Sequence, residues 1–112
     1  MAIGIMFEAK GVTRQQYDQV SKAVMPNEMM PRGMRYHVAG PIEGGWNVFE
    51  IWESEADAKR FFDEKLGAEL KRAGIANVQQ RPFPIHNLLA DPTFNAQSVA
   101  HGANMKSGVQ RA

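Results

Sequence analysis

The chain has no cysteine and no long apolar run. With no cysteine among 112 residues, disulfides, thiolate nucleophiles and cysteine metal ligands are excluded. This composition fits a reducing compartment, so we expect a cytoplasmic protein. No apolar stretch approaches the ~18 residues of a membrane-spanning helix. The N-terminal residues also lack the basic region that opens a signal peptide, and we therefore expect no membrane partner.

Neither sign of charge is in excess. Thirteen basic and twelve acidic side chains give a net charge of +1, so no basic surface indicates nucleic acid or an anionic membrane. Three histidines far apart, without a closely spaced ligand pair, predict no metal site. No phosphate loop, nucleotide fingerprint or serine elbow is present, and we expect no cofactor. The length suits one domain with one core.

Apolar periodicity predicts the order strand, helix, strand, strand, helix, strand. The strands are expected at residues 2–8, 34–39, 46–52 and 79–86, and the first helix at 14–25. The second helix should begin at Ser54 and be interrupted near Gly67. Its core face is predicted from a row spaced four residues apart, namely Ala58, Phe62, Leu66 and Leu70. Pro82 and Pro84 place the last strand at a sheet edge, because neither has an N–H to donate.

This order is the split β-α-β pattern, and it predicts an α+β, ferredoxin-like βαββαβ domain over residues 1–87. The four-stranded antiparallel sheet should carry both helices on one face. Residues 88–112 show no period and are rich in small polar residues, so we expect an extension without regular structure. Both faces of the strand at 46–52 are apolar, which predicts a homodimer through the open side of the sheet.

The strand at residues 46–52 holds the main candidates for a functional site. Side chains alternate along a strand, so Trp46, Val48, Glu50 and Trp52 share one face. A carboxylate between two tryptophans in a buried strand needs a hydrogen-bonded or charged partner. The strand at 34–39 is the expected source of that partner.

The partner depends on the strand register. If the turn at residues 40–45 pairs Ala39 with Trp46, then His37 lies opposite Val48 and Arg35 lies opposite Glu50. A slip of one residue would turn Arg35 and His37 to the other face. Two interpretations stay open. His37 is either an acid or base tuned by Glu50 beside an aromatic pocket, or part of a purely structural cross-strand pair.

Two further segments offer binding residues. The loop at residues 26–33 lies among four methionines, including Met29. Thioether chains adapt to irregular shapes, so the loop either packs over the end of the core or forms a pliable lid on an apolar ligand. His86, at the end of the last strand, is either an exposed, inert histidine or a part of the site.

The run Val48-Phe49-Glu50-Ile51-Trp52, continuing into Glu53-Ser54-Glu55-Ala56 before an aromatic helix, resembles the dimeric α+β barrel superfamily. Within it, the antibiotic-biosynthesis-monooxygenase-like branch is the most similar, and the resemblance covers about residues 1–87. Members include cofactor-free oxygenases, haem-degrading enzymes, lactone isomerases and many proteins of unknown role. The resemblance implies a pocket between sheet and helices, lined by Trp52.

The chain departs from two branches of that superfamily. Haem-degrading members combine an asparagine on the first strand with a histidine ten residues after the tryptophan, where this chain has Phe62. Quinone-forming oxygenases have an asparagine four residues before the tryptophan, where this chain has Val48. Asn47 is one position away and should face the other side of the sheet.

We therefore expect a dimeric protein that binds a compact apolar or aromatic molecule, as a cofactor-independent monooxygenase or isomerase. A non-catalytic binding or interaction protein on the same scaffold is the alternative. The catalytic candidates are His37, Glu50 and Trp52. The candidates for substrate binding are Arg35, Trp46, Phe62, His86 and Met29.

Overall fold

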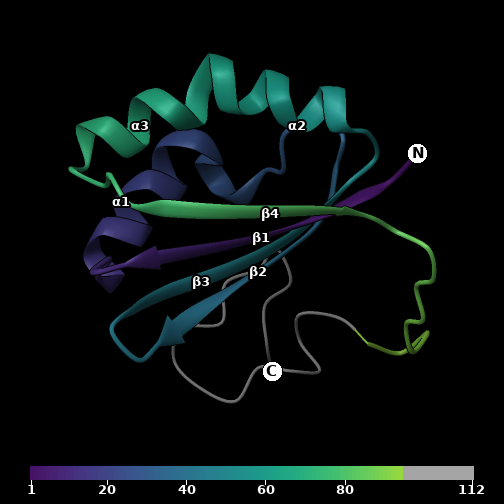
Figure 1. Cartoon of the computed structure of the whole chain (residues 1–112). Helices are drawn as coiled ribbons and strands as arrows, with labels where there is room; N and C mark the ends of the chain where they lie inside the picture. Colours follow the sequence, from purple (N-terminus) through teal and green to yellow (C-terminus); the bar gives the residue numbers. More distant parts are fainter. Residues whose placement is uncertain (95–112) are drawn as a thin grey trace.

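The computed structural model describes residues 1–94 and has the expected ferredoxin-like architecture (Figure 1). Along the chain lie β1 (Ile3–Lys10), α1 (Arg14–Val24), the short 3-10 turn η1 (Pro26–Glu28), β2 (Met34–Ile42), β3 (Gly45–Trp52), α2 (Glu55–Phe61), the π-helical turn η2 (Phe62–Leu66), α3 (Gly67–Arg72) and β4 (Val78–Pro84). All strand pairs are antiparallel, in the order β2-β3-β1-β4. The helices form one layer above one face of this sheet. The prediction of β4 as an edge strand is confirmed.

Both long helical segments begin at the residues expected from the sequence. Thr13 caps α1: its side chain accepts from the Gln16 N–H at 3.1 Å, and the Gln16 side chain accepts from the Thr13 N–H at 3.0 Å. This reciprocal pair satisfies two backbone donors that the first turn leaves free. Ser54 caps α2 by accepting from the Asp57 N–H at 3.1 Å. These caps determine the residue at which each helix begins.

The predicted core row of the second helix is wrong at one position. Phe61 is buried and packs in the core, whereas Phe62 is only partly buried. The reason is the π-helical turn η2, in which the Gly67 N–H bonds to the Phe62 carbonyl five residues earlier. The extra residue shifts the phase of the helix, so Phe61 and Leu66 share the inner side. The interruption expected near Gly67 is thereby confirmed.

The predicted register of β2 and β3 is also wrong, by two residues. β2 continues to Ile42, which pairs with Gly45, so only Glu43 and Gly44 turn the chain. A positive φ of 78° at Gly44 makes this tight turn possible. His37 consequently lies opposite Glu50, and Ala39 lies opposite Val48.

Arg35 is not the partner of Glu50, because the register places His37 there, and Arg35 itself falls at a shift of the ladder between Met34 and Tyr36. An irregularity of this kind leaves one residue out of the alternation. Arg35 is therefore exposed and binds Glu53 at 2.6 Å, with both side chains about 60% accessible to solvent. His37 keeps its predicted face and takes the place expected for Arg35.

The helices cover one face of the sheet and not the other. On the helix side, Ile5, Trp52 and Phe61 form the core with Val20 and Val24 of α1. The opposite side, which we call the open face, carries an aromatic row in which Phe49 contacts Tyr36 at 6.2 Å and Phe83 at 6.1 Å between ring centroids. Val38 and Phe83 remain nearly half exposed there. Asn47 also lies on this face, as expected, with its amide bonded to the sulfur of Met6.

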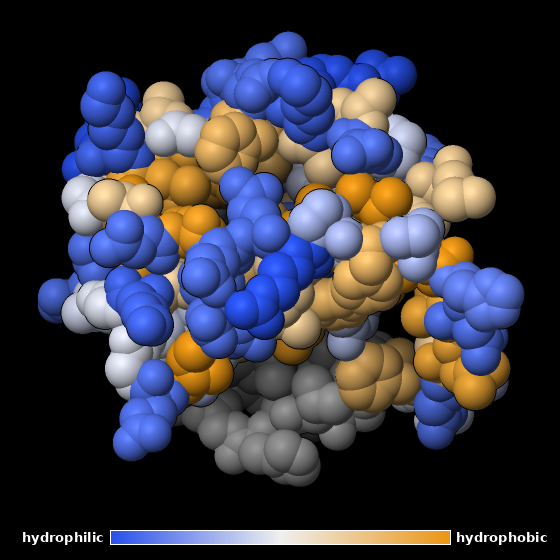
Figure 2. Space-filling view, viewed as in Figure 1, coloured by the Kyte–Doolittle hydropathy of each residue, from blue (hydrophilic) through white to orange (hydrophobic). Residues whose placement is uncertain are grey.

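After β4 the chain leaves the sheet as a segment without helix or strand up to residue 94. Leu88, Leu89 and Phe94 are exposed in this segment, which lies at the right of the molecule in Figures 1 and 2. Figure 2 otherwise shows polar side chains over the helices and apolar patches between them and the sheet. Most of the predicted extension, residues 95–112, lies outside the described residues. Within residues 1–94, no helix is long and apolar enough to cross a membrane.

Candidate functional site

A chain of three side-chain hydrogen bonds connects α1 to the centre of the sheet. The hydroxyl of Tyr17 lies 2.7 Å from Nε2 of His37, and Nδ1 of His37 lies 3.0 Å from Oε2 of Glu50. The other carboxylate oxygen of Glu50 accepts from the indole N–H of Trp52 at 2.9 Å. Glu50 is 5% exposed and Trp52 is 1% exposed, so this end of the hydrogen-bond network is shielded from solvent.

The secondary structure determines which residues meet. Glu50 and Trp52 are two apart on β3 and both face the helices. His37 faces them from the paired position on β2. Tyr17 comes from the inner row of α1 that also holds Val20 and Val24. Rigid elements thus supply every member of the network.

The proton positions follow from the chemistry of the partners. An ionised carboxylate only accepts hydrogen bonds, so Nδ1 of His37 donates to Glu50. In the neutral imidazole Nε2 is then the acceptor, and the hydroxyl of Tyr17 donates to it. A hydroxyl, an imidazole and a carboxylate in this order form the arrangement by which a base withdraws a proton and stabilises the resulting cation.

Burial raises the pKa of the Tyr17 phenol above its ordinary value of 10.0, and a hydrogen bond with Ser21 partly opposes that shift. The negative charge of Glu50 adds to the increase. A raised pKa favours the neutral phenol. Tyr17 therefore carries a proton at neutral pH and can donate it toward His37.

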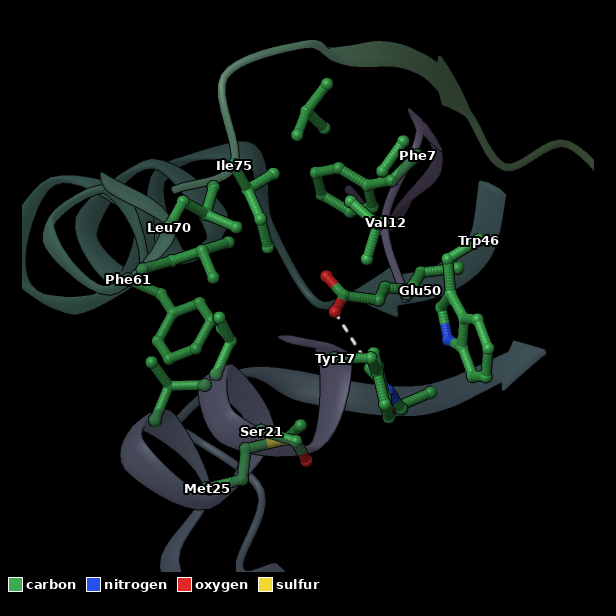
Figure 3. Close-up of a pocket in the computed structure, with 17 residues that line it drawn as sticks. Phe7, Val12, Tyr17, Ser21, Met25, Trp46, Glu50, Phe61, Leu70 and Ile75 are labelled. Atoms are coloured by element: carbon green, nitrogen blue, oxygen red, sulfur yellow. Dashed lines mark hydrogen bonds and ion pairs between the residues drawn. The ribbon is translucent and has the colours of Figure 1, made fainter. Parts of the chain in front are cut away.

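Trp46 forms an aromatic wall beside this network. Its ring stacks on Tyr17 with centroids 5.4 Å apart and an interplanar angle of 25°. Figure 3 shows the indole nitrogen on the ring edge that faces Tyr17 and Glu50. That nitrogen is buried and has no hydrogen-bond partner among the residues of the described part of the chain.

The network borders a partly open hollow between α1, the later helices and the sheet, which we call the inner cavity (Figure 3). Its volume is about 90 Å³. Most of the wall is apolar, including Phe7, Val12, Val20, Val24, Phe61 and Leu70. The side chains of its wall that carry a polar atom are those of Tyr17, Ser21, His37, Trp46 and Glu50. A cavity of ~150 Å³ accommodates benzene in another protein, so this one suits only a small group without adjustment.

A second hollow, which we call the side groove, lies between α2 and the β1–β4 side of the sheet and has a volume of about 490 Å³. Phe7, Glu50, Phe61 and Leu66 line both hollows. Trp52 and Phe62 line the side groove, and Lys59 and Asp63 lie at its polar side. The inner cavity and the side groove are thus adjacent, with Glu50 in the wall of each.

The structure brings together half of the residues that the sequence singled out. His37, Glu50 and Trp52 are hydrogen-bonded to one another in a chain, and Trp46 stands beside them. Phe62 belongs to the side groove. The other three binding candidates, Met29, Arg35 and His86, are exposed and line neither hollow. The Met25 side chain, by contrast, lines the inner cavity.

Sequence reasoning missed Tyr17, which lies in the first predicted helix but was not among the candidate site residues. A signal was available. The hydroxyl of a tyrosine on a buried helical face needs a hydrogen-bond partner, and His37 was the polar side chain already expected on the facing strand.

Groups of three or more histidine, aspartate or glutamate side chains placed to hold a metal ion are absent from residues 1–94.

No protein-family model and no curated protein sequence matches the chain. Solved structures do match it. One is Rv0793 from Mycobacterium tuberculosis, with a TM-score of 0.64 and 10% identity over 80% of this chain and 100% of that one. Another is SnoaB, a cofactor-independent oxygenase from Streptomyces nogalater, with a TM-score of 0.59 and 8% identity over 80% and 97%.

A third similar structure is a dimeric ferredoxin-like protein of unknown function from Thermobifida fusca. It has a TM-score of 0.57 and 18% identity, over 76% of this chain and 92% of the other. At these identities the likeness establishes the fold. The chain therefore has the ferredoxin-like fold that these structures share, as the sequence predicted.

Proposed function

We propose that this protein binds a compact, largely apolar molecule between sheet and helices and removes a proton from it, as a cofactor-independent oxygenase or isomerase. The observation that carries the proposal is the continuous chain Tyr17–His37–Glu50, whose tyrosine end borders an apolar cavity. The fold shared with SnoaB, a cofactor-independent oxygenase, adds support.

The geometry defines a route for the proton. The ligand gives its proton to the oxygen of Tyr17 while the hydroxyl proton of Tyr17 passes to Nε2 of His37, 2.7 Å away. Tyr17 remains neutral, in agreement with its raised pKa. The imidazolium is balanced by the carboxylate of Glu50, which Trp52 holds from the other side.

The product of this step is a ligand anion in a cavity with few polar groups. The anion either regains a proton at another carbon, which is an isomerisation, or reacts with dioxygen. Both outcomes share the first step, so that step is the one to test. Positioned general bases of this kind contribute about 10²–10⁴-fold to a rate.

The test uses 1,2-benzisoxazole, a compact aromatic compound that opens to a phenolate when a base removes its ring C–H proton. We expect the protein to accelerate this opening, and His37→Ala and Tyr17→Phe each to reduce the acceleration by about 100-fold. Tyr36→Phe is the matched control, because Tyr36 lies on the open face and should leave the rate unchanged. Circular dichroism checks that each variant is folded.

An equal rate in the wild type, His37→Ala and Tyr17→Phe would refute proton abstraction by this network. Binding of benzisoxazole without any acceleration would instead favour the alternative function, a non-catalytic binding protein on the same scaffold.

We further propose that the protein is a homodimer through the open face. Val38 and Phe83 are nearly half exposed there and continue the aromatic row of Tyr36 and Phe49. A contiguous apolar surface of this kind is typical of a protein interface. The dimeric state of the structural relative from Thermobifida fusca is consistent with this.

A further inference from the structure

We infer that the indole N–H of Trp46 is a hydrogen-bond donor for the ligand, and that the ligand is therefore a carbonyl compound or a phenol rather than a hydrocarbon. This inference rests on the proposed function, because it assumes that the inner cavity is the ligand site. It assigns to Trp46 a polar role in addition to its aromatic contact with Tyr17.

The first support is an unmade hydrogen bond. The Trp46 nitrogen is buried yet has no partner among the described residues, whereas the nitrogen of Trp52 donates to Glu50 at 2.9 Å. Buried N–H groups are almost always paired, since leaving one unpaired forfeits its hydrogen bond to water. An unpaired donor in the wall of a cavity is thus ready for an acceptor that arrives with a ligand.

The second support is position. Trp46 lines the inner cavity together with Tyr17 and His37, and Figure 3 shows its nitrogen turned toward Tyr17 and Glu50. The groups of the network are already committed: Tyr17 donates to His37, and Glu50 accepts from both His37 and Trp52. Ser21 is hydrogen-bonded to Tyr17, so within residues 1–94 the Trp46 N–H is the cavity donor that has no partner for its hydrogen.

The third support is the chemistry of proton removal. When a ligand C–H or O–H bond breaks and its proton passes to Tyr17, the electron pair stays on the ligand. In a ketone or phenol this charge develops on oxygen, as an enolate or phenolate. A fixed N–H donor beside that oxygen stabilises the charge more than it stabilises the neutral ligand. A hydrocarbon would leave the donor unpaired and gains nothing from it.

The same residue combines two functions in a small volume. Its ring stacks on Tyr17 at 5.4 Å as part of the cavity wall, and its N–H favours a ligand with an oxygen atom. At about 90 Å³ the inner cavity holds little beyond such an oxygen-bearing group. The side groove shares four wall residues with the inner cavity and has a volume of about 490 Å³ beside it.

The test compares acetophenone with α-methylstyrene, which has nearly the same shape but carries a CH₂ group in place of the carbonyl oxygen. Affinities are measured by ligand-detected NMR titration. We expect the wild type to prefer acetophenone by about tenfold, as one hydrogen bond to a buried donor implies. Trp46→Phe keeps an aromatic ring without the N–H, so its preference should fall below about twofold. Tyr36→Phe serves as the matched aromatic control.

A second measurement needs no variant of Trp46. The protein has two tryptophans, and therefore two indole N–H resonances in a ¹⁵N-correlated spectrum. The N–H of Trp52 is hydrogen-bonded to a carboxylate and should therefore resonate farther downfield in the free protein. The other resonance, that of Trp46, should move downfield with acetophenone and not with α-methylstyrene.

The outcomes separate the two proposals. Equal binding of both compounds by the wild type, with no downfield shift for acetophenone, would overturn the role of Trp46 and leave the inner cavity as a ligand site. In that case water satisfies the indole. Failure of both compounds to bind would overturn the assignment of the cavity itself, and the proposed function with it.

Discussion

Replacing Glu50 with glutamine tests whether the network is a buried charge system. Glu50 is 5% exposed and accepts two hydrogen bonds, from His37 at 3.0 Å and from Trp52 at 2.9 Å. Glutamine has nearly the same shape, and its oxygen can still accept from Trp52. Its NH₂ group, however, faces a nitrogen of His37 that is itself a donor, so one bond is lost or the imidazole must change its tautomer.

The expected cost follows from burial. Removing one partner of a buried pair typically destabilises a protein by ~3–5 kcal/mol, and a hydrogen bond to a charged group is worth ~1.5–3 kcal/mol. Because one of the two bonds survives, we expect Glu50→Gln to lower the free energy of unfolding by about 2–3 kcal/mol. With a urea dependence of ~1–3 kcal/mol per molar, the unfolding midpoint should fall by about 1 M or more.

The chain provides a matched control three residues away. Glu53 binds Arg35 at 2.6 Å, but its side chain is 61% exposed. Exposed pairs contribute about 0–1 kcal/mol, so the same substitution, Glu53→Gln, should hardly move the midpoint. Unfolding is followed by tryptophan fluorescence at one fixed protein concentration, because the stability of a dimer depends on concentration. Equal midpoints for Glu50→Gln and Glu53→Gln would refute the assignment of Glu50 as a buried, paired carboxylate.

Two further predictions concern the tyrosine and the open face. In Tyr36→Phe the remaining tyrosine, Tyr17, should ionise at a higher pH in the folded protein than in the same protein unfolded in urea, as followed by its phenolate absorbance. Because the pKa of Tyr17 is raised in the folded protein, the neutral phenol contributes to stability below pH 10, and this contribution is lost as the pH rises through the pKa of the folded protein. Identical titration curves for the folded and the unfolded protein would contradict this prediction. The wild type should sediment at about twice 12.5 kDa at micromolar concentration, and Val38→Glu should sediment as the monomer. Ala23→Glu, on the exposed side of α1, should remain dimeric, and a monomeric wild type would contradict the proposed interface.

The fold was predictable because each element carries its own periodicity. Alternation along residues 46–52 fixed which side chains of β3 face the helices, and caps at Thr13 and Ser54 fixed the helix starts. These signals are local: each depends on residues within one or two turns of chain. Together with the order of elements they suffice for the sheet and its helix layer.

The partners across strands were not predictable in the same way, since register depends on the turn. Gly40 and Pro41 resemble turn residues, yet they belong to β2, and Glu43 and Gly44 make the turn. The resulting shift of two residues preserves the face of every side chain because the period of a strand is two. His37 and Glu50 therefore remained together although the predicted pairing was wrong.

Two local irregularities produced the remaining errors. The shift between Met34 and Tyr36 moved Arg35 out of the site, and the π-helical turn gave Phe61 the core position expected for Phe62. Neither has a clear signal in the sequence, because each consists of one extra residue in an otherwise regular pattern. The π-helical turn lies next to both hollows, which Phe61 and Leu66 line. The sequence thus predicted three residues of the hydrogen-bond network, His37, Glu50 and Trp52, but not Tyr17.

The composition of the network argues for chemistry rather than packing. Apolar residues of similar volume fill a core at least as well as a buried charged network, and such replacements are often neutral or stabilising. A purely structural role for Glu50 would need only its hydrogen bonds with His37 and Trp52. Instead the chain of hydrogen bonds continues to Tyr17 on α1, outside the sheet. Tyr17 borders the inner cavity beside the N–H of Trp46, which has no partner within residues 1–94. We propose that the network acts at its tyrosine end, because that end borders the inner cavity.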